Sequence, residues 1–174
     1  MSAFDRLLGE LLRRDVRFVV IGVWGANYWA RSAGTTFSTQ DRDLFLPLEP
    51  ANLLAAWEAA CAMGYELWSG AEPLGEPLDL WLAERVVERR AGVKALRRDD
   101  ENNVEVDFTL VMAGFDFEQV WAERRHFLVE GNEIPVARLV HIARSKTLCD
   151  RPKDRLFLAT YEEALRSLLP DDPD

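Results

Sequence analysis

The pattern of apolar and polar positions predicts helices interleaved with short strands. Apolar residues recur at helical spacing from Ser2 to Arg14, where Ser2 is the expected N-cap, while short β-branched runs such as 18–21 indicate buried strands. Predicted helices cover 2–14, 26–31, 51–63, 78–90, 115–125, 137–148 and 153–169, and predicted strands cover 17–21, 44–46, 65–68, 93–97, 104–111, 127–129 and 134–136. This order predicts an α+β fold: a short mixed sheet flanked by helices and closed by a C-terminal helical pair.

Turn-forming residues mark the connections between these elements. Glycines and prolines make 69–77 irregular, and we interpret this segment as a mobile flap or an interface. The polar run 99–103 predicts a hairpin turn, Pro135 predicts an edge position, and Pro152 suits the first turn of the last helix. Without a break in composition, we expect one domain over 1–169 and a disordered tail over 170–174.

Length and composition place the chain among globular proteins. The 174 residues are 48% hydrophobic, and no apolar run approaches the roughly 20 residues of a membrane span. The first residues show no basic region followed by an apolar one, so no secretory signal is expected. Two cysteines are too few for a disulfide framework or a zinc site, which favours a cytoplasmic location.

Charge narrows the range of partners. The formal net charge of -9 argues against a broad surface for duplex nucleic acid, which needs Lys and Arg to neutralise phosphates, although it leaves contact with one nucleic-acid end open. Basic residues nevertheless gather between 138 and 155. They form either a solvated helix face or a surface that faces phosphate.

Acidic residues suggest chemistry at two strands. Asp41 and Asp43 precede a predicted strand, and alternation would place both on one face, where they suit a divalent cation and repel each other without one. Asp107 lies on a later predicted strand, with Glu105 on the same face. Either acid is therefore a candidate third ligand.

Together these residues resemble a known family. The strand ending at Gly22, the run Thr39-x-Asp41-x-Asp43, Asp107 on its own strand and the basic segment 146–154 resemble the minimal nucleotidyltransferase fold of the DNA polymerase β-like superfamily. The resemblance extends from about residue 18 to residue 154. It is closest to small stand-alone members, which include toxin–antitoxin and phage-defence proteins and enzymes that adenylylate lincosamide and aminoglycoside antibiotics.

The resemblance implies a Mg²⁺-dependent transfer of a nucleoside monophosphate from a nucleoside triphosphate, such as ATP, to an acceptor hydroxyl. Asp41, Asp43 and Asp107 would be the catalytic and metal-binding residues, with two Mg²⁺ ions possible. The nucleotide-binding residues would be Gly22, Val23, Thr39, Lys146, Arg151 and Lys153. Backbone N–H groups after Gly22 and the cationic side chains would hold the triphosphate.

Two departures from the family pattern motivate an alternative. Val23 replaces the second Gly or Ser of the family, and Arg42 replaces an apolar residue; Gly25 is a candidate to restore space near Val23. The alternative is a catalytically degenerate binding or regulatory module, such as half of a toxin–antitoxin pair with a partner protein. For an active enzyme, the acceptor stays open among a small molecule, a tRNA end and a protein.

Overall fold

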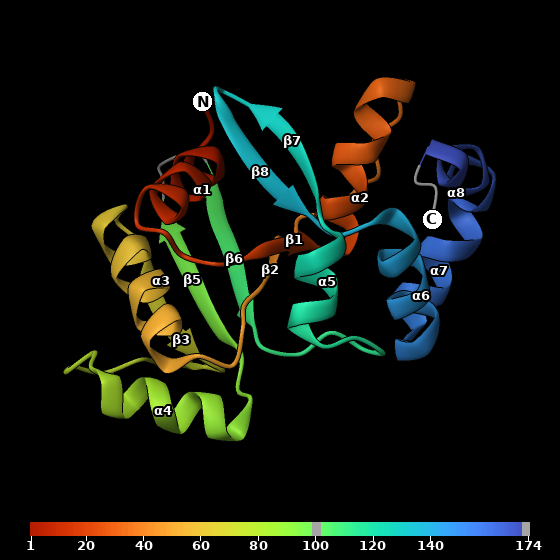
Figure 1. Cartoon of the computed structure of the whole chain (residues 1–174). Coiled ribbons are helices and arrows are strands. Elements are labelled where there is room, and N and C mark those ends of the chain that lie inside the picture. The colour runs from red at the N-terminus through yellow and green to blue at the C-terminus, as the bar shows by residue number, and fades with distance from the viewer. Residues whose placement is uncertain (99–101, 172–174) are drawn as a thin grey trace.

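The computed structural model describes residues 1–98 and 102–171 (Figure 1). The predicted turn at 99–103 falls partly outside these residues, as does most of the predicted tail. The helices are α1 (Ala3–Arg13), α2 (Gly22–Ala30), α3 (Pro50–Ala62), α4 (Leu80–Arg89), α5 (Phe117–Glu123), α6 (Leu139–Cys149), α7 (Pro152–Thr160) and α8 (Glu162–Leu168), with 3₁₀ turns η1 (Arg31–Ala33) and η2 (Leu169–Asp171). The strands are β1 (Val19–Ile21), β2 (Asp43–Phe45), β3 (Glu66–Ser69), β4 (Glu72–Pro73), β5 (Val93–Arg98), β6 (Asn103–Thr109), β7 (Arg125–Val129) and β8 (Asn132–Val136).

All eight strands of the described chain form one mixed sheet in the order β4-β3-β5-β6-β2-β1-β8-β7. The pairs β2–β6 and β1–β8 are parallel, and the other neighbouring pairs are antiparallel. Helices and a mixed sheet confirm the α+β class. Seven of its strands were predicted, and the two-residue strand β4 was not.

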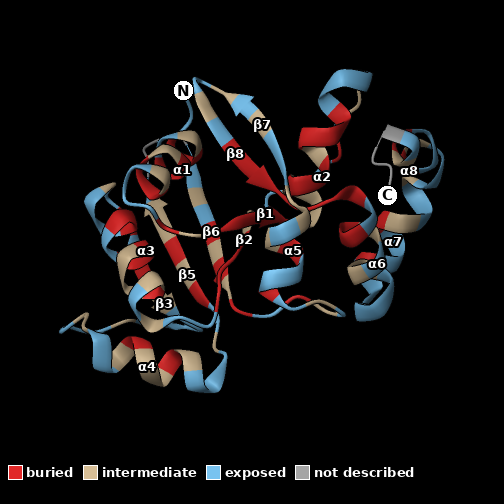
Figure 2. Ribbon diagram, viewed as in Figure 1, coloured by how far each residue is buried: buried red, intermediate tan, exposed pale blue. Residues whose placement is uncertain are grey.

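One face of the β5–β6 hairpin is covered and the other is open. Val93, Ala95, Val106 and Phe108 are buried, whereas the residues that alternate with them are only partly buried or exposed (Figure 2). In Figure 1, α1, α3 and α4 lie toward one side of the molecule and α6–α8 toward the other, with β1 and β2 between them. The open face of this hairpin continues onto the two central strands, β2 and β1, which follow β6 in the order of the sheet.

Helix α2 begins four residues earlier than predicted, at Gly22 rather than Ala26. Two glycines and a β-branched valine have low helix propensity, but packing overrides it. A Cβ added at Gly25 would lie 3.0 Å from Ile142 Cδ1 of α6 and 3.0 Å from the Val20 carbonyl oxygen of β1. Gly25 thus lets α2 approach α6 and β1, and its place in the core corrects the expectation that it opens space beside Val23.

The prediction of two C-terminal helices is wrong in number, because three helices, α6, α7 and α8, follow β8. Pro152 opens α7 as predicted, but the helix stops at Tyr161, where φ is -110°. The Tyr161 ring packs edge-on against Phe37, and the Ser38 N–H donates to its hydroxyl oxygen at 3.2 Å. These contacts hold the 34–42 segment against the helices. Residues 170 and 171, which were predicted to belong to a disordered tail, instead lie in η2.

The edge position predicted for Pro135 is also wrong. Strand β8 lies between β7 and β1, but its register with β1 is the single pair Val20↔Val136. Pro135 therefore lies beside the end of β1, where a missing N–H breaks no ladder.

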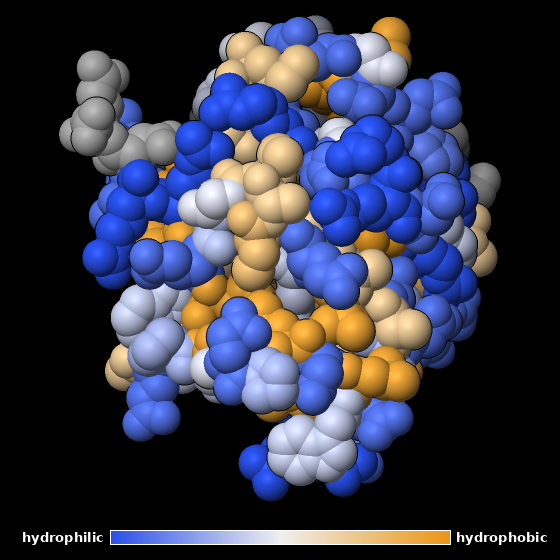
Figure 3. All heavy atoms as spheres, turned by 90° about the vertical axis from the view of Figure 1, so that its left-hand side faces the viewer, coloured by the Kyte–Doolittle hydropathy of each residue, from blue (hydrophilic) through white to orange (hydrophobic). Residues whose placement is uncertain are grey.

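The segment 69–77 contains the two-residue strand β4, which pairs with β3 and forms one edge of the sheet. Figure 3, which turns the left-hand side of Figure 1 toward the viewer, shows apolar surface between polar groups in the lower half of that face. Leu80 and Trp81 of α4 are among the exposed large apolar residues. The flap or interface assigned to 69–77 stays a prediction.

Gly25→Val is expected to lower the free energy of unfolding by about 2 kcal/mol or more, because the new side chain would overlap Ile142 and the Val20 carbonyl. Urea denaturation followed by circular dichroism measures it. Gly75→Val is the control, since nothing lies within 4 Å of its Cβ position. An equal loss of unfolding free energy in both variants would contradict close packing at Gly25.

Candidate functional site

Two aspartates stand side by side at the centre of the sheet. The parallel register of β2 and β6 pairs Asp43 with Asp107, so both side chains point to the same face. Asp41 lies before β2 and its side chain is 61% exposed, so strand alternation does not fix its direction as the sequence suggested. The sheet therefore positions two of the three acids, and the loop positions the third.

This pairing is electrostatically unfavourable. Burial, then the charges of Asp107 and Asp41, raises the pKa of Asp43 from 3.8 to about 6. Burial also raises the pKa of Asp107, and the Lys94 ammonium group opposes this shift. Two carboxylates held together in this way favour a cation.

Gly22 is packed directly against Asp43. Its φ is +67°, and a Cβ at this position would lie 2.5 Å from Asp43 Oδ2. Any side chain here would be strained and would overlap the carboxylate. Gly22 therefore lets the start of α2 approach the aspartate closely, as predicted for a strand-to-helix turn beside a ligand.

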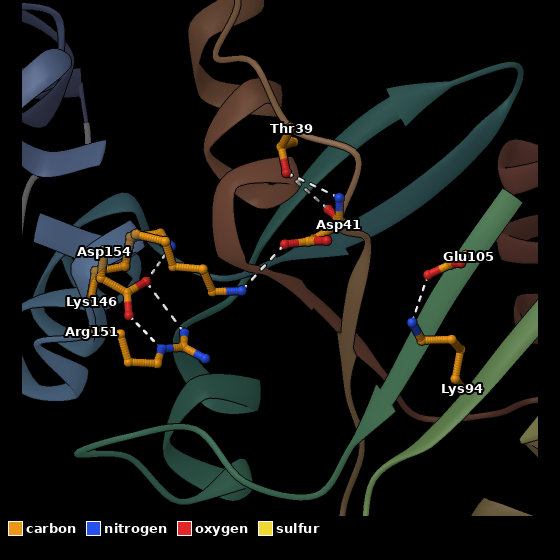
Figure 4. Close-up of polar contacts among 8 residues, drawn as sticks. Thr39, Asp41, Lys94, Glu105, Lys146, Arg151 and Asp154 are labelled. Carbon is orange, nitrogen blue, oxygen red and sulfur yellow. Dashed lines mark hydrogen bonds and ion pairs between the residues drawn. The ribbon is translucent and has the colours of Figure 1, made fainter. Parts of the chain in front are cut away.

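The predicted cations Lys146 and Arg151 are tied to a buried acid. Lys146 Nζ lies 3.1 Å from Asp154 Oδ1, and Arg151 Nε lies 2.6 Å from Asp154 Oδ2 (Figure 4). The Asp154 side chain is 0% exposed. Burial alone would raise its pKa, but hydrogen bonds from Arg151 and Lys146 outweigh burial and lower it. Asp154 thus fixes both cations between α6 and α7.

Lys153 and Thr39 hold Asp41. Lys153 Nζ lies 3.4 Å from Asp41 Oδ2, and the Asp41 N–H donates to Thr39 Oγ1 at 3.1 Å. Figure 4 shows Asp41 and Thr39 together on the loop before β2. The loop thus turns the Asp41 carboxylate toward the cation of α7.

These residues surround a cavity of about 440 Å³. Its lining combines polar groups with aromatic residues of the last helices: Val23, Ser38, Thr39, Gln40, Asp41, Asp43, Lys146, Arg151, Lys153, Leu156, Phe157, Thr160 and Tyr161. A second cavity of about 240 Å³ shares Asp43, Lys146 and Arg151 with the first and adds Gly22. The structure therefore brings the predicted site residues to two adjoining cavities, except for Asp107, which lines neither.

Arg42 has a different environment from the one its sequence position suggested. Strand β2, which it precedes, is interior, so no sheet edge accommodates the guanidinium group. Its carbon Cζ lies 4.4 Å from the Trp24 ring centroid and 5.6 Å from that of Phe4, and Nη1 donates to the Gln40 carbonyl. Cation–π contacts thus stabilise the charge.

Glu105, the alternative third acid, is engaged elsewhere. Lys94 Nζ donates to Glu105 Oε2 at 2.6 Å (Figure 4). Lys94 is also the register partner of Asp107 across β5 and β6. This arrangement leaves Asp107 the better placed neighbour of Asp43.

The donor chemistry suits Mg²⁺, because carboxylate oxygens are hard ligands and Gly22 leaves space beside Asp43. Within residues 1–98 and 102–171, however, no three His, Cys, Asp or Glu side chains are gathered so that they could hold an ion as they stand. Asp41 must turn away from Lys153 to join Asp43 and Asp107.

Sequence reasoning missed Lys94, Phe157 and Tyr161. The strand pattern of 93–97 indicated the element that carries Lys94, but its register with β6 was not in the sequence pattern. Phe157 and Tyr161 follow helical spacing, which is typical of core residues.

Comparisons with known proteins give no match, either among protein-family models or among curated protein sequences. Within the described parts of the chain, no helix is both long and apolar enough to cross a membrane.

Asp43→Asn is expected to stabilise the protein at pH 7.5 by up to about 3 kcal/mol. The raised pKa of Asp43 means that the native state binds a proton more tightly than the unfolded chain. Ionised Asp43 therefore destabilises the wild-type protein. This destabilisation is fully present above pH 6 and disappears as the pH falls toward 3.8. Urea denaturation at several pH values measures the free energy of unfolding of the variant and of the wild type. The difference between the two should vanish near pH 4. Asp150→Asn is the control, and a variant no more stable than wild type would contradict the unfavourable pairing.

Asp154→Asn is expected to lower the free energy of unfolding by about 3–5 kcal/mol, because two cations lose their buried partner. Thermal and urea denaturation measure the loss. Glu162→Gln removes one member of an exposed pair with Arg166 and should cost about 0–1 kcal/mol. Similar losses in the two variants would show that Asp154 is not a buried anchor.

Proposed function

We propose that the protein is a Mg²⁺-dependent nucleotidyltransferase that transfers a nucleoside monophosphate to an acceptor hydroxyl. The observation that carries this proposal is the acid pair Asp43 and Asp107, which stands beside a cavity that also contains three cations. Negative and positive groups at one site suit a ligand that is itself a polyanion bound with a cation. The family resemblance of the sequence points to the same chemistry.

The two cavities provide room for a nucleoside triphosphate. Phe157 and Tyr161 supply aromatic surface for a base in the larger cavity, where Ser38 and Thr160 add hydroxyl groups. Lys146 and Arg151 line both cavities, so a triphosphate that crosses from one to the other would pass these cations. The smaller cavity begins at Gly22, where the N-terminus of the nine-residue helix α2 favours phosphate oxygens.

Transfer would rest on positioning and electrostatics. Asp43 and Asp107 would hold Mg²⁺, together with Asp41 once its ion pair with Lys153 is broken, and the bound Mg²⁺ would supply positive charge for the phosphate oxygens. Asp107 would accept the proton of the acceptor hydroxyl. Lys153, once released from Asp41, would be free to contact phosphate.

The contact between Lys153 and Asp41 favours a second candidate function. A protein that had lost turnover could keep this ion pair permanently, and it would then act as a nucleotide-binding or regulatory module. Pyrophosphate release separates the two candidates.

The test is isothermal titration with ATP, CTP, GTP and UTP in Mg²⁺, followed by a pyrophosphate-release assay with small-molecule, tRNA and protein acceptors. We expect at least one nucleotide to bind, and Asp43→Asn and Asp107→Asn to reduce transfer by about 100-fold or more. Asp150→Asn, which removes an exposed carboxylate paired with Arg155, is the matched control.

Absence of Mg²⁺-dependent binding for all four nucleotides would refute the nucleotidyltransferase and a nucleotide-binding module alike. Binding without pyrophosphate release from any acceptor would favour the regulatory module.

A further inference from the structure

Strand β6 presents two carboxylates on the open face of the sheet, Glu105 and Asp107. They are two residues apart, so their side chains point the same way. Asp107 is paired with Asp43 on one side and with Lys94 on the other. A row of Asp43, Asp107 and Lys94 therefore crosses three neighbouring strands.

The Lys94 side chain reaches along this face to Glu105 rather than straight across to its register partner. Its Nζ lies 2.6 Å from Glu105 Oε2, a short charge-assisted hydrogen bond. Glu105 is directly opposite Leu96, which offers it no charge. Lys94 thus engages one of the two acids of β6 and leaves the other beside Asp43.

We propose that Lys94 is a positioning residue of the transfer reaction: it pairs with Glu105 and so holds this second carboxylate of β6 away from a cation at Asp43 and Asp107, which the strand register places together. This inference rests on the proposed function. It concerns whether Glu105 is kept out of the site, whereas the proposed function concerns the pair Asp43 and Asp107.

The pairing is reciprocal, and this determines what each substitution does. Without Lys94, Glu105 is a free carboxylate on the same face as Asp107, where it adds a second oxygen ligand for a cation. Without Glu105, the Lys94 ammonium group is free to turn to Asp107, its neighbour across the strands, and to compete with a cation there. Removing both restores the balance of charge around Asp107.

A double-mutant cycle measures this coupling without relying on activity. Mn²⁺ replaces Mg²⁺ as the probe and is titrated calorimetrically into the wild type, Lys94→Met, Glu105→Gln and the double variant, all without nucleotide. We expect Lys94→Met to bind Mn²⁺ about tenfold more tightly and Glu105→Gln about tenfold more weakly, with the double variant close to wild type. Nucleotidyl transfer should fall in each single variant and recover in the double variant.

Arg85→Met in α4 is the matched control. Arg85 and Lys94 are similarly exposed, at 38% and 40%, and each is paired with a glutamate, but Arg85 lies on helix α4, whereas Lys94 lies on the strand next to Asp107. The Arg85→Met variant should change neither the affinity for Mn²⁺ nor the rate of nucleotidyl transfer. Circular dichroism and urea denaturation confirm that every variant is folded.

The outcomes separate this inference from the proposed function. Equal loss of Mn²⁺ affinity in Glu105→Gln and the double variant would make Glu105 itself the ligand and overturn the inference alone. Unchanged affinity in Lys94→Met would also overturn it. A folded wild type that binds no Mn²⁺, with or without nucleotide, would overturn the proposed function and this inference with it.

Discussion

The parallel pairing of β2 with β6 is the constraint on which the proposed site depends. It places two aspartates next to each other at the centre of a sheet, where the backbone hydrogen bonds of the two strands fix their Cα positions. Their mutual repulsion and burial disfavour the charged state, which is why the pKa of Asp43 rises to about 6. Such an arrangement stores unfavourable energy that a bound cation would release.

Neighbouring cationic side chains reduce the unfavourable energy of the acid pair in different ways. Lys94 lies on the far side of Asp107, and Lys153 reaches Asp41 from α7. The cations at Lys146 and Arg151 are balanced instead by Asp154, so they keep their positions without collapsing onto the acid pair. Positive and negative groups can therefore stand close together around one cavity and remain available to a ligand.

The sequence predicted most elements because their signals are local. Helical spacing, a strand ending in glycine and an N-cap serine each concern a few adjacent residues, and α1 does carry a capping box between Ser2 and Asp5. The early start of helix α2 and the break at Tyr161 were missed because both depend on tertiary contacts: with Ile142 and Val20 in one case, and with Phe37 and Ser38 in the other. Similarly, the sequence indicated two acids of β6, but only the folded structure showed that Lys94, the register partner of Asp107, forms its hydrogen bond with Glu105.

The break at Tyr161 has a consequence for how the protein is made. Helix α7 and Tyr161 supply one wall of the larger cavity, and Tyr161 holds the opposite loop in place. Ribosomal synthesis releases the N-terminal residues first, so both aspartates emerge well before the wall that encloses them. A nascent chain halted before residue 152 would carry the acid pair on the sheet, open to solvent, and the larger cavity would form only after residues 152–161 had been added.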